Sequence, residues 1–388
     1  MYKNRVEILM VLTVILLIIG FSSCDSSNSK YLLGDKVIKK GEIIDFELSK
    51  ELSTKFIQFQ YYDSKIFCLN KMNDTSIYIF NLKGKQIGTL RYKRKGPNGV
   101  GDISGFYVHN YDSIFVLNSY AYKLFLINNE GRVHNVYSLF KTGVNKNFIN
   151  TTLPYVNSAA SMSIRNEFIY VPAIPDQSPF INNYEDNNLL IKLNLKTSLV
   201  EYMLGFPEEY KGFYIYGTYT FVSTCQTAND SCIAVSYILD KNLYTYNYIS
   251  DELDKINNSK CNFLDDVELP KKLPPPPNEE KERVLEALQT DKYGGIYYDK
   301  WHNIFYRFAI KGLSHKDAKK YCENGRGLKL KYFLMVYDED LVLIAERRIE
   351  DMSSGLELFV TEKGLYIKGD YENEEDKVFF QQYIVSDK

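Results

Sequence analysis

The densest group of side chains able to bind a ligand lies between residues 294 and 308. Flat apolar rings beside a few fixed polar groups are the usual composition of a site for a sugar or a peptide. Trp301, in the middle of this stretch, is the single tryptophan of the chain. The predicted ligand-binding residues are Tyr298, Trp301, His302, Tyr306 and Arg307.

The same residues also have a structural interpretation. Side chains alternate along a strand, so Tyr306 and Phe308 share one face while Arg307 lies on the other. In this interpretation Arg307 pairs with a carboxylate in the core of a sheet, and Trp301 packs between sheets. The sequence favours the structural interpretation, although no other stretch is a better candidate for a site.

Motifs that would identify an enzyme are absent from the sequence. Neither HExxH nor GxSxG occurs, and only four histidines are present. The glycine-rich run at residues 96–101 lacks the lysine and hydroxyl residue of a phosphate-binding loop, and no helix pattern follows it. We predict no catalytic residue and no cofactor, and a metal ion has no motif to support it.

One pair of cysteines is placed so that it could form a disulfide bond. Cys225 and Cys232 flank a polar turn, so a disulfide across the resulting hairpin is an alternative to two free thiols. Cys68 lies in an apolar run and is expected to be a buried thiol. No CxxC or Cys/His spacing indicates zinc.

Composition indicates a β-rich globular protein and argues against nucleic acid as a partner. The 33 Tyr and 23 Phe suit the pleated, half-buried surface of a sheet. The formal net charge of the 388 residues is −2, so no basic excess exists to neutralise a phosphate backbone.

The N-terminus predicts a lipid anchor. Residues 1–23 read as a signal peptide, because two basic residues precede an apolar run that is short for a membrane span. Phe-Ser-Ser-Cys, ending at Cys24, resembles the lipobox of bacterial lipoproteins, with Phe21 in place of the usual Leu. Residues 24–34 form a polar tether. We expect lipidation at Cys24 and a location in the bacterial cell envelope, with the outer membrane favoured; an ordinary signal peptide or an uncleaved anchor is the alternative.

The sequence has almost no long helical periodicity, and patterns of short strands recur along it instead. Six units of strands and tight polar turns begin near residues 65, 113, 167, 231, 295 and 357. Such a repeat is typical of the blades of a β-propeller, which is a ring of small sheets. We predict one all-β domain, a six-bladed β-propeller over residues 35–388; seven blades are the alternative.

Several segments outside the repeats have expected roles. Residues 36–48 are expected to form a strand that completes the C-terminal blade and closes the ring. The glycine-rich run is expected to connect into a blade that begins at Asp112. Short helices are expected at residues 278–290 and 314–323, with Ser314 capping the second.

Three stretches resemble an uncharacterised family of Bacteroides-type lipoproteins, known only as a domain of unknown function. They are the lipobox, GPNGVGDISGF followed by DSIFVL, and GIYYDKWHNIFYRF at residues 295–308. That family is similar to six-bladed, TolB-like propellers. The resemblance implies an envelope location and a propeller fold, and it carries over no activity.

These observations together predict a binding or scaffold module, anchored in the membrane by its lipid. Its partner would be a peptide, a glycan or an envelope protein held on one axial face. The alternative is a metal-dependent hydrolase or lyase, which needs three or more Asp, Glu, Asn or His side chains converging on the axis. A channel lined by Tyr, Ser and Phe would count against that enzyme, and a purely structural protein would have no concave pocket.

Overall fold

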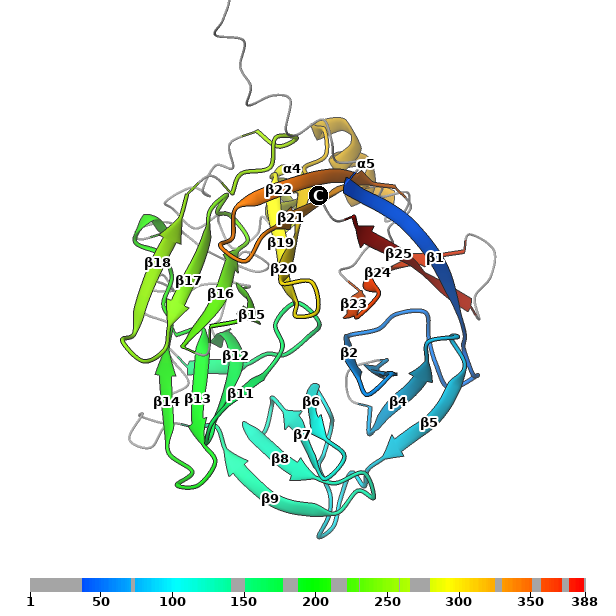
Figure 1. Cartoon of the computed structure of the whole chain (residues 1–388), viewed down its shortest axis with the longest axis vertical. Coiled ribbons are helices and arrows are strands. Elements are labelled where there is room, and N and C mark those ends of the chain that lie inside the picture. The colour runs from blue at the N-terminus through cyan, green and yellow to red at the C-terminus, as the bar shows by residue number, and fades with distance from the viewer. Residues whose placement is uncertain are drawn as a thin grey trace, which may run out of the picture.

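The chain forms six antiparallel sheets arranged around a central axis (Figure 1). The computed structural model describes residues 37–70, 74–140, 151–176, 188–210, 222–229, 231–257, 259–265, 280–324, 330–350, 357–371 and 377–386. The predicted signal peptide, Cys24 and the tether lie outside these residues. Among the helices that are described, none is long and apolar enough to cross a membrane. The prediction of a six-bladed propeller is confirmed, and we call the sheets blades 1 to 6.

Each blade runs from a strand near the axis to a strand at the rim (Figure 1). Blades 1 and 2 consist of β2 (Gln58–Tyr62), β3 (Lys65–Leu69), β4 (Ser76–Asn81) and β5 (Gln86–Arg91), then β6 (Gly105–Asn110), β7 (Ser113–Asn118), β8 (Lys123–Ile127) and β9 (Val133–Ser138). Blades 3 and 4 consist of β10 (Thr151–Pro154), β11 (Ser163–Arg165), β12 (Phe168–Asp176), β13 (Leu190–Asn194) and β14 (Val200–Met203), then β15 (Val222–Gln226), β16 (Cys232–Tyr237), β17 (Leu243–Asn247) and β18 (Glu252–Ile256). Blades 5 and 6 consist of β19 (Lys292–Asp299), β20 (Ile304–Lys311), β21 (Lys331–Tyr337) and β22 (Leu343–Ile349), then β23 (Leu358–Thr361), β24 (Gly364–Asp370), β25 (Lys377–Val385) and β1 (Ile38–Glu47).

The N-terminal strand closes the ring, as predicted. Strand β1 pairs antiparallel with β25 and so becomes the outer strand of blade 6. Its buried Phe46 ring lies 4.4 Å from the ring of Phe80 in blade 1 and 4.7 Å from that of Phe380 in blade 6. One strand therefore joins the last blade to the first by backbone pairing and by aromatic packing.

Four of the six blades begin one strand earlier than the sequence repeats suggested. The predicted starts near 65 and 113 fall on β3 and β7, the second strands of their blades. The first strand of blade 2, β6, lies before Asp112, so the expected start of that blade was wrong, whereas the glycine-rich run at residues 96–101 does connect blade 1 to blade 2. The turn before β6 does need its glycines, since Gly96 and Gly101 have φ angles of 96° and 73°.

Two helices lie outside the ring, where the sequence predicted them. They are α4 (Glu280–Gln289) and α5 (His315–Asn324), which lie side by side in Figure 1. The Ser314 hydroxyl caps α5, accepting a hydrogen bond from the Asp317 N–H at 3.2 Å. A short 3₁₀ helix, Glu208–Tyr210, precedes blade 4.

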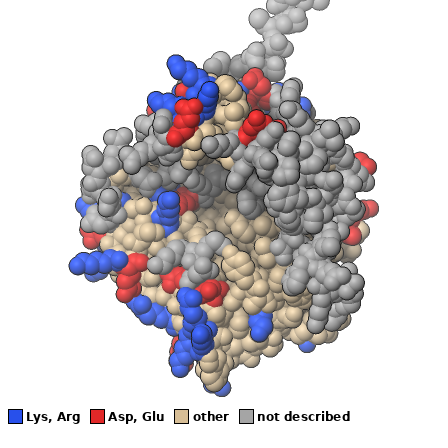
Figure 2. Space-filling view, turned by 180° about the vertical axis from the view of Figure 1, so that it is seen from behind, with Lys and Arg blue, Asp and Glu red and all other residues tan. Residues whose placement is uncertain are grey.

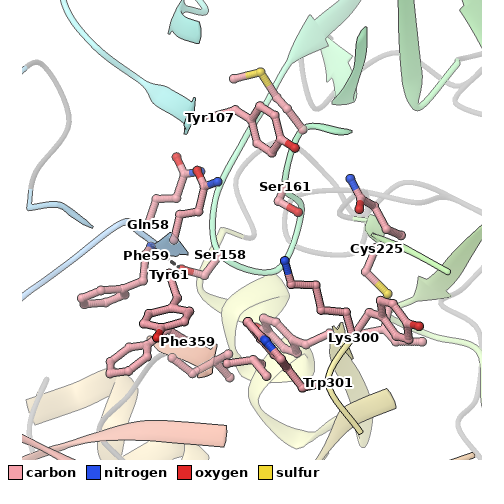
Figure 3. Close-up of a pocket in the computed structure, with 18 residues that line it drawn as sticks. Gln58, Phe59, Tyr61, Tyr107, Ser158, Ser161, Cys225, Lys300, Trp301 and Phe359 are labelled. Carbon is pink, nitrogen blue, oxygen red and sulfur yellow. Dashed lines mark hydrogen bonds between the residues drawn. The ribbon is translucent and has the colours of Figure 1, made fainter. Parts of the chain in front are cut away.

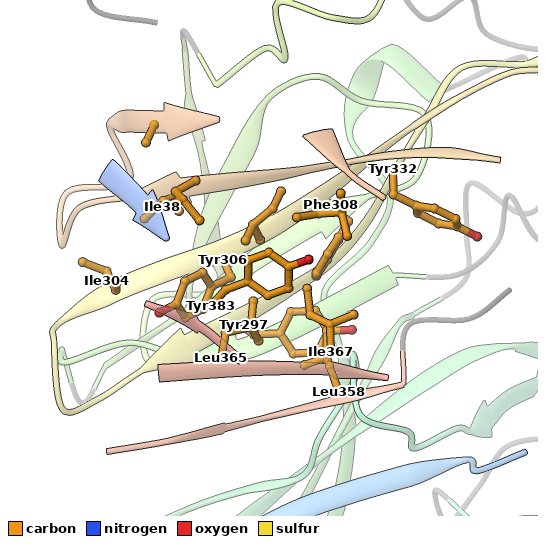
Figure 4. Packing of buried hydrophobic residues seen from close by; sticks show 14 of the residues in the cluster. Ile38, Tyr297, Ile304, Tyr306, Phe308, Tyr332, Leu358, Leu365, Ile367 and Tyr383 are labelled. Atoms are coloured by element: carbon orange, nitrogen blue, oxygen red, sulfur yellow. The ribbon is translucent and has the colours of Figure 1, made fainter. Parts of the chain in front are cut away.

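Apolar side chains fill the spaces between neighbouring blades. Between blades 5 and 6, Tyr306 and Phe308 of β20 meet Leu365 and Ile367 of β24 (Figure 4). All four are almost fully buried. Because each blade packs on both sides, the strands nearest the axis are held rigidly, and a rigid frame suits a binding site.

Of the two alternatives for Cys225 and Cys232, the structure has two free thiols and no disulfide. The predicted hairpin exists, as β15 and β16, but its register places Cys225 opposite Ala234. The Cys232 carbonyl accepts a hydrogen bond from Thr227, which lies two residues beyond Cys225. The two thiols are therefore offset along the hairpin, and both are free.

Candidate functional site

A pocket of about 230 Å³ lies where the inner strands of the blades converge (Figure 3). Strands β2, β6, β15, β19 and β23 contribute to its wall, and blade 3 contributes the loop before β11. Seen from behind, the ring is hollowed near its centre, with charges of both signs spread around it (Figure 2). The side chains that line the pocket include Gln58, Gln60, Tyr61, Ser158, Tyr297, Tyr298, Lys300 and Trp301.

Two glutamines in the wall are already committed to hydrogen bonds. The Gln58 amide donates to the Phe106 carbonyl at 2.7 Å and accepts from the Phe106 N–H at 2.9 Å. Gln60 makes the same pair of bonds with Val108, at 2.8 and 2.7 Å. These side chains join β2 to β6 across the gap between blades 1 and 2. They stabilise the wall, and one donor and one acceptor of each amide are already occupied.

Hydroxyl groups cap other backbone amides of the inner strands. The Phe59 N–H donates to Ser158 Oγ at 2.8 Å, and the Ile296 N–H donates to Ser223 Oγ at 2.9 Å. An extended peptide adds to a sheet through free main-chain donors and acceptors. With these amides capped, β2 and β19 offer such a peptide fewer donors.

Aromatic rings and one ammonium group form the open side of the pocket. Trp301 is 41% exposed, and its ring packs edge-on against Tyr61 with 5.7 Å between the centroids. The Lys300 ammonium lies 4.9 Å from the centroid of the Trp301 ring, and its side chain extends into the pocket (Figure 3). Among the described residues that line the pocket, Lys300 is the one with a charged side chain. A flat apolar surface therefore lies beside a single positive charge.

The buried carboxylate of Asp299 fixes the turn that carries Lys300 and Trp301. Its Oδ1 accepts hydrogen bonds from the N–H groups of Trp301 and His302, both at 3.1 Å. Its Oδ2 accepts from the Tyr306 hydroxyl at 3.2 Å and lies 2.8 Å from His302 Nδ1. An aspartate that bonds the following backbone is the usual means of holding such a turn. Asp299 thus holds the turn that carries the Trp301 ring and the Lys300 ammonium group.

The structure brings only two of the five predicted ligand-binding residues to the pocket. Trp301 and Tyr298 line it, and the Tyr298 hydroxyl donates to Asn303 at 2.8 Å. His302 and Tyr306 are outside the lining and contact Asp299 behind it. Arg307 lies in the interior between blades.

Arg307 is fully buried and bonds to backbone carbonyls, not to the carboxylate that the sequence suggested. Its guanidinium donates to the carbonyls of Asp240 and Lys241 at 2.6 and 2.8 Å, and to Ser236 Oγ at 2.9 Å. The central carbon of the guanidinium, Cζ, lies 4.0 Å from the centroid of the Tyr293 ring. The turn between β16 and β17 supplies several carbonyls close together, which suits the five donors of a guanidinium. Arg307 therefore joins blade 5 to blade 4.

Two titratable groups deep in the wall stay neutral. Burial raises the pKa of the Tyr297 hydroxyl and of the Cys225 thiol well above their ordinary values. The Tyr297 hydroxyl has no hydrogen-bond partner among the described residues, although it is buried. A buried hydroxyl without a partner is costly, so it is a donor that a ligand could satisfy.

The donor set of the pocket does not fit a metal-dependent hydrolase. The part of the lining that the structure describes contains no Asp, Glu, Asn or His side chain. Across the described part of the chain, no three such acidic, His or Cys groups lie close enough together to hold a metal ion. The lining does contain Tyr, Ser and Phe side chains, the composition that was expected to count against such an enzyme.

Comparison with known proteins identifies a family and its fold. A family described as a domain of unknown function (DUF4221) matches residues 23–348. A crystal structure of a DUF4221 member from Bacteroides vulgatus is 18% identical, with a TM-score of 0.72 over 90% of this chain and 99% of that chain. A Bacteroides fragilis protein described as a candidate exported protein is 12% identical, with a TM-score of 0.52 over 91% and 96%. No curated protein matches.

Proposed function

The chain belongs to the family of domains of unknown function called DUF4221, and we propose that it is a binding module that holds a glycan in its axial pocket. The observation that carries this proposal is the composition of the pocket wall. Partly exposed aromatic rings, Trp301 and Tyr61, stand beside hydroxyl groups on a rigid frame. Sugar rings have apolar faces and hydroxyl rims, and they bind to surfaces of this kind.

The inner strands support a compact ligand over an extended peptide. The amides of Phe59, Phe106 and Ile296 already donate to side chains of the ring. A peptide that bound as an added strand would find these donors occupied. A glycan end needs no continuous row of backbone donors, so it agrees better with this wall. A peptide or an envelope protein remains the competing partner in the test below.

Neither of the other two functions receives support from the pocket. A hydrolase or lyase with an axial metal would need carboxylate or imidazole ligands, and the lining contains none. A purely structural protein would not need a concave pocket of about 230 Å³ at the centre of the ring.

The single tryptophan makes the test direct. Because Trp301 is the one tryptophan of the chain and lies in the pocket, its fluorescence reports on that site alone. We expect glycans added to the intact protein to shift or quench this emission in a saturable way, at a constant ionic strength. Extended peptides of matched length are the control. Saturable binding of peptides with no response to any glycan would contradict the proposal.

We further propose that the module is lipid-anchored in the cell envelope. The relative from Bacteroides fragilis is described as a candidate exported protein, and the N-terminus of this chain has the pattern of a lipoprotein signal. Lipidation of Cys24 would hold the ring at a membrane by the polar tether.

Replacing the lipidated residue tests this location. Cys24→Ala is expected to move the protein from the membrane fraction to the soluble fraction, because the acyl chains provide the only proposed anchor. Cys322→Ala, on α5, is the matched control and should stay with the membranes. If the Cys24→Ala protein loses its signal peptide and still pellets with membranes, the anchor is not at Cys24. Fractionation and immunoblotting give the answer.

A further inference from the structure

The charge in the pocket has one sign. Lys300 supplies the single charged side chain of the lining, and it forms no ion pair among the described residues. It lies over the Trp301 ring, so the ammonium and the flat surface are presented together. Any ligand that covers the ring therefore comes within reach of a cation whose charge no carboxylate of the wall neutralises.

Nearby acidic groups are already engaged. Asp299 is fully buried behind the turn and accepts hydrogen bonds from two backbone amides and from Tyr306. The Glu362 carboxylate is hydrogen-bonded to the Tyr61 hydroxyl and raises its pKa, together with the larger effect of burial, to about 12. The carboxylates of Asp299 and Glu339 act on the lining residue Tyr298 more strongly than the opposing guanidinium of Arg165, and Glu339 itself accepts a hydrogen bond from Asn303. The positive charge of Lys300 is therefore a local feature of the pocket, in a chain whose net charge is −2.

We infer that the pocket prefers an acidic sugar, one whose ring carries a single negative charge such as the carboxylate of a uronic acid. This inference rests on the proposed function and names the kind of glycan. The ring would cover Trp301 while its carboxylate accepts a charge-assisted hydrogen bond from Lys300. A single ammonium suits a single charge, whereas phosphate groups with two charges are usually held by several cations or by bidentate arginines. The Tyr297 hydroxyl, buried and without a partner, is a further donor at the wall.

The first experiment compares two oligosaccharides that differ only in the terminal residue, glucuronic acid or glucose, with Trp301 emission as the signal. We expect the acidic sugar to bind about tenfold more tightly, because it would form one additional charge-assisted hydrogen bond. Lys300→Gln should abolish this difference, so that the ratio of the two affinities falls to about one. Lys83→Gln, in the exposed turn between β4 and β5, removes the same charge far from the pocket and should preserve the difference. A third oligosaccharide, ending in a sulfated glucose, shows whether the site accepts a sulfate ester in place of a carboxylate.

A pair of dyes tests the preference for charge without the stereochemistry of a sugar. 8-Anilinonaphthalene-1-sulfonate and N-phenyl-1-naphthylamine share the same rings, and only the first carries an anion. We expect Lys300→Gln to weaken binding of the anionic dye about tenfold more than binding of the neutral dye. Energy transfer from Trp301 is strongest for dye bound in the pocket, because transfer falls off steeply with distance.

The outcomes separate this inference from the proposed function. If both sugars bind equally and Lys300→Gln changes neither sugar nor dye, the preference for an acid is wrong while glycan binding stands. If neither sugar binds, the proposed glycan function is wrong and the acidic sugar fails with it, even where the dyes still distinguish charge. Tighter binding of the acidic sugar that Lys83→Gln removes equally would assign the effect to the overall charge and overturn the role of Lys300.

Discussion

Replacing Arg307 with methionine is expected to lower the free energy of unfolding by about 3 kcal/mol, since two or more buried acceptors each lose their partner. The substitution keeps an apolar stem of similar length but removes every donor. The carbonyls of Asp240 and Lys241, which receive bonds of 2.6 and 2.8 Å, would be left in the interior without partners. The contact of the guanidinium with the Tyr293 ring would also be lost.

Urea unfolding followed by circular dichroism measures this change, and an exposed arginine provides the control. Arg91 forms an ion pair with Glu51 at 2.7 Å, with both side chains more than half exposed. Arg91→Met should therefore change stability by less than about 1 kcal/mol. Arg307→Lys keeps the charge but cannot reach several carbonyls at once, so an intermediate loss is expected. Equal, small shifts for Arg307→Met and Arg91→Met would show that the buried bonds contribute little.

The sequence predicted the ring better than it predicted where each blade begins. Middle strands such as β3 and β7 are almost wholly apolar, because both of their faces pack against neighbouring blades. The strand β2 contains Gln58 and Gln60, whose polar ends bond to the next blade. A polar residue at every second position does not stand out as a buried strand in a sequence. The first strand of blade 1 was missed for this physical reason.

The closing strand and the added helices could be predicted because their signals are local. Residues 36–48 had strand character and no partner within a repeat, so pairing with the last blade was the simplest way to close a ring. Ser314 stands at the start of α5 with Asp317 three residues later, which is a capping pattern within one turn. The family resemblance and the six-bladed fold are both confirmed. Both concern architecture, and neither identifies an activity.

The site could be predicted only in part, because its members come from six blades. Trp301 and Tyr298 were chosen for their residue types, and both line the pocket. Arg307 is also a residue type that is common in binding sites. Its side chain, however, lies on the face of β20 that packs against blade 4, so it is buried in the interior. Lys300 was not predicted, since a lysine in a turn looks like any other solvated lysine until the fold places it over a ring.

Trp301→Ala should weaken ligand binding at least tenfold while leaving the fold intact. The indole ring is 41% exposed and forms the flat surface on which the proposed sugar ring would lie. Losing a central aromatic contact commonly costs about 2 kcal/mol or more of binding free energy. Stability should change little, because the backbone N–H of residue 301, which donates to Asp299, is still present in the alanine variant.

Calorimetry measures this loss, because the variant has no tryptophan left to report. Tyr120→Ala removes an exposed aromatic ring outside the pocket and should bind the glycan normally. Trp301→Phe keeps a smaller flat ring and should recover part of the affinity. Unfolding of the Trp301→Ala protein would mean that the indole belongs to the core, as the structural interpretation of the sequence held. Unchanged affinity in a folded variant would mean that the ligand does not lie on this ring, and Lys300 would then lose its place in recognition as well.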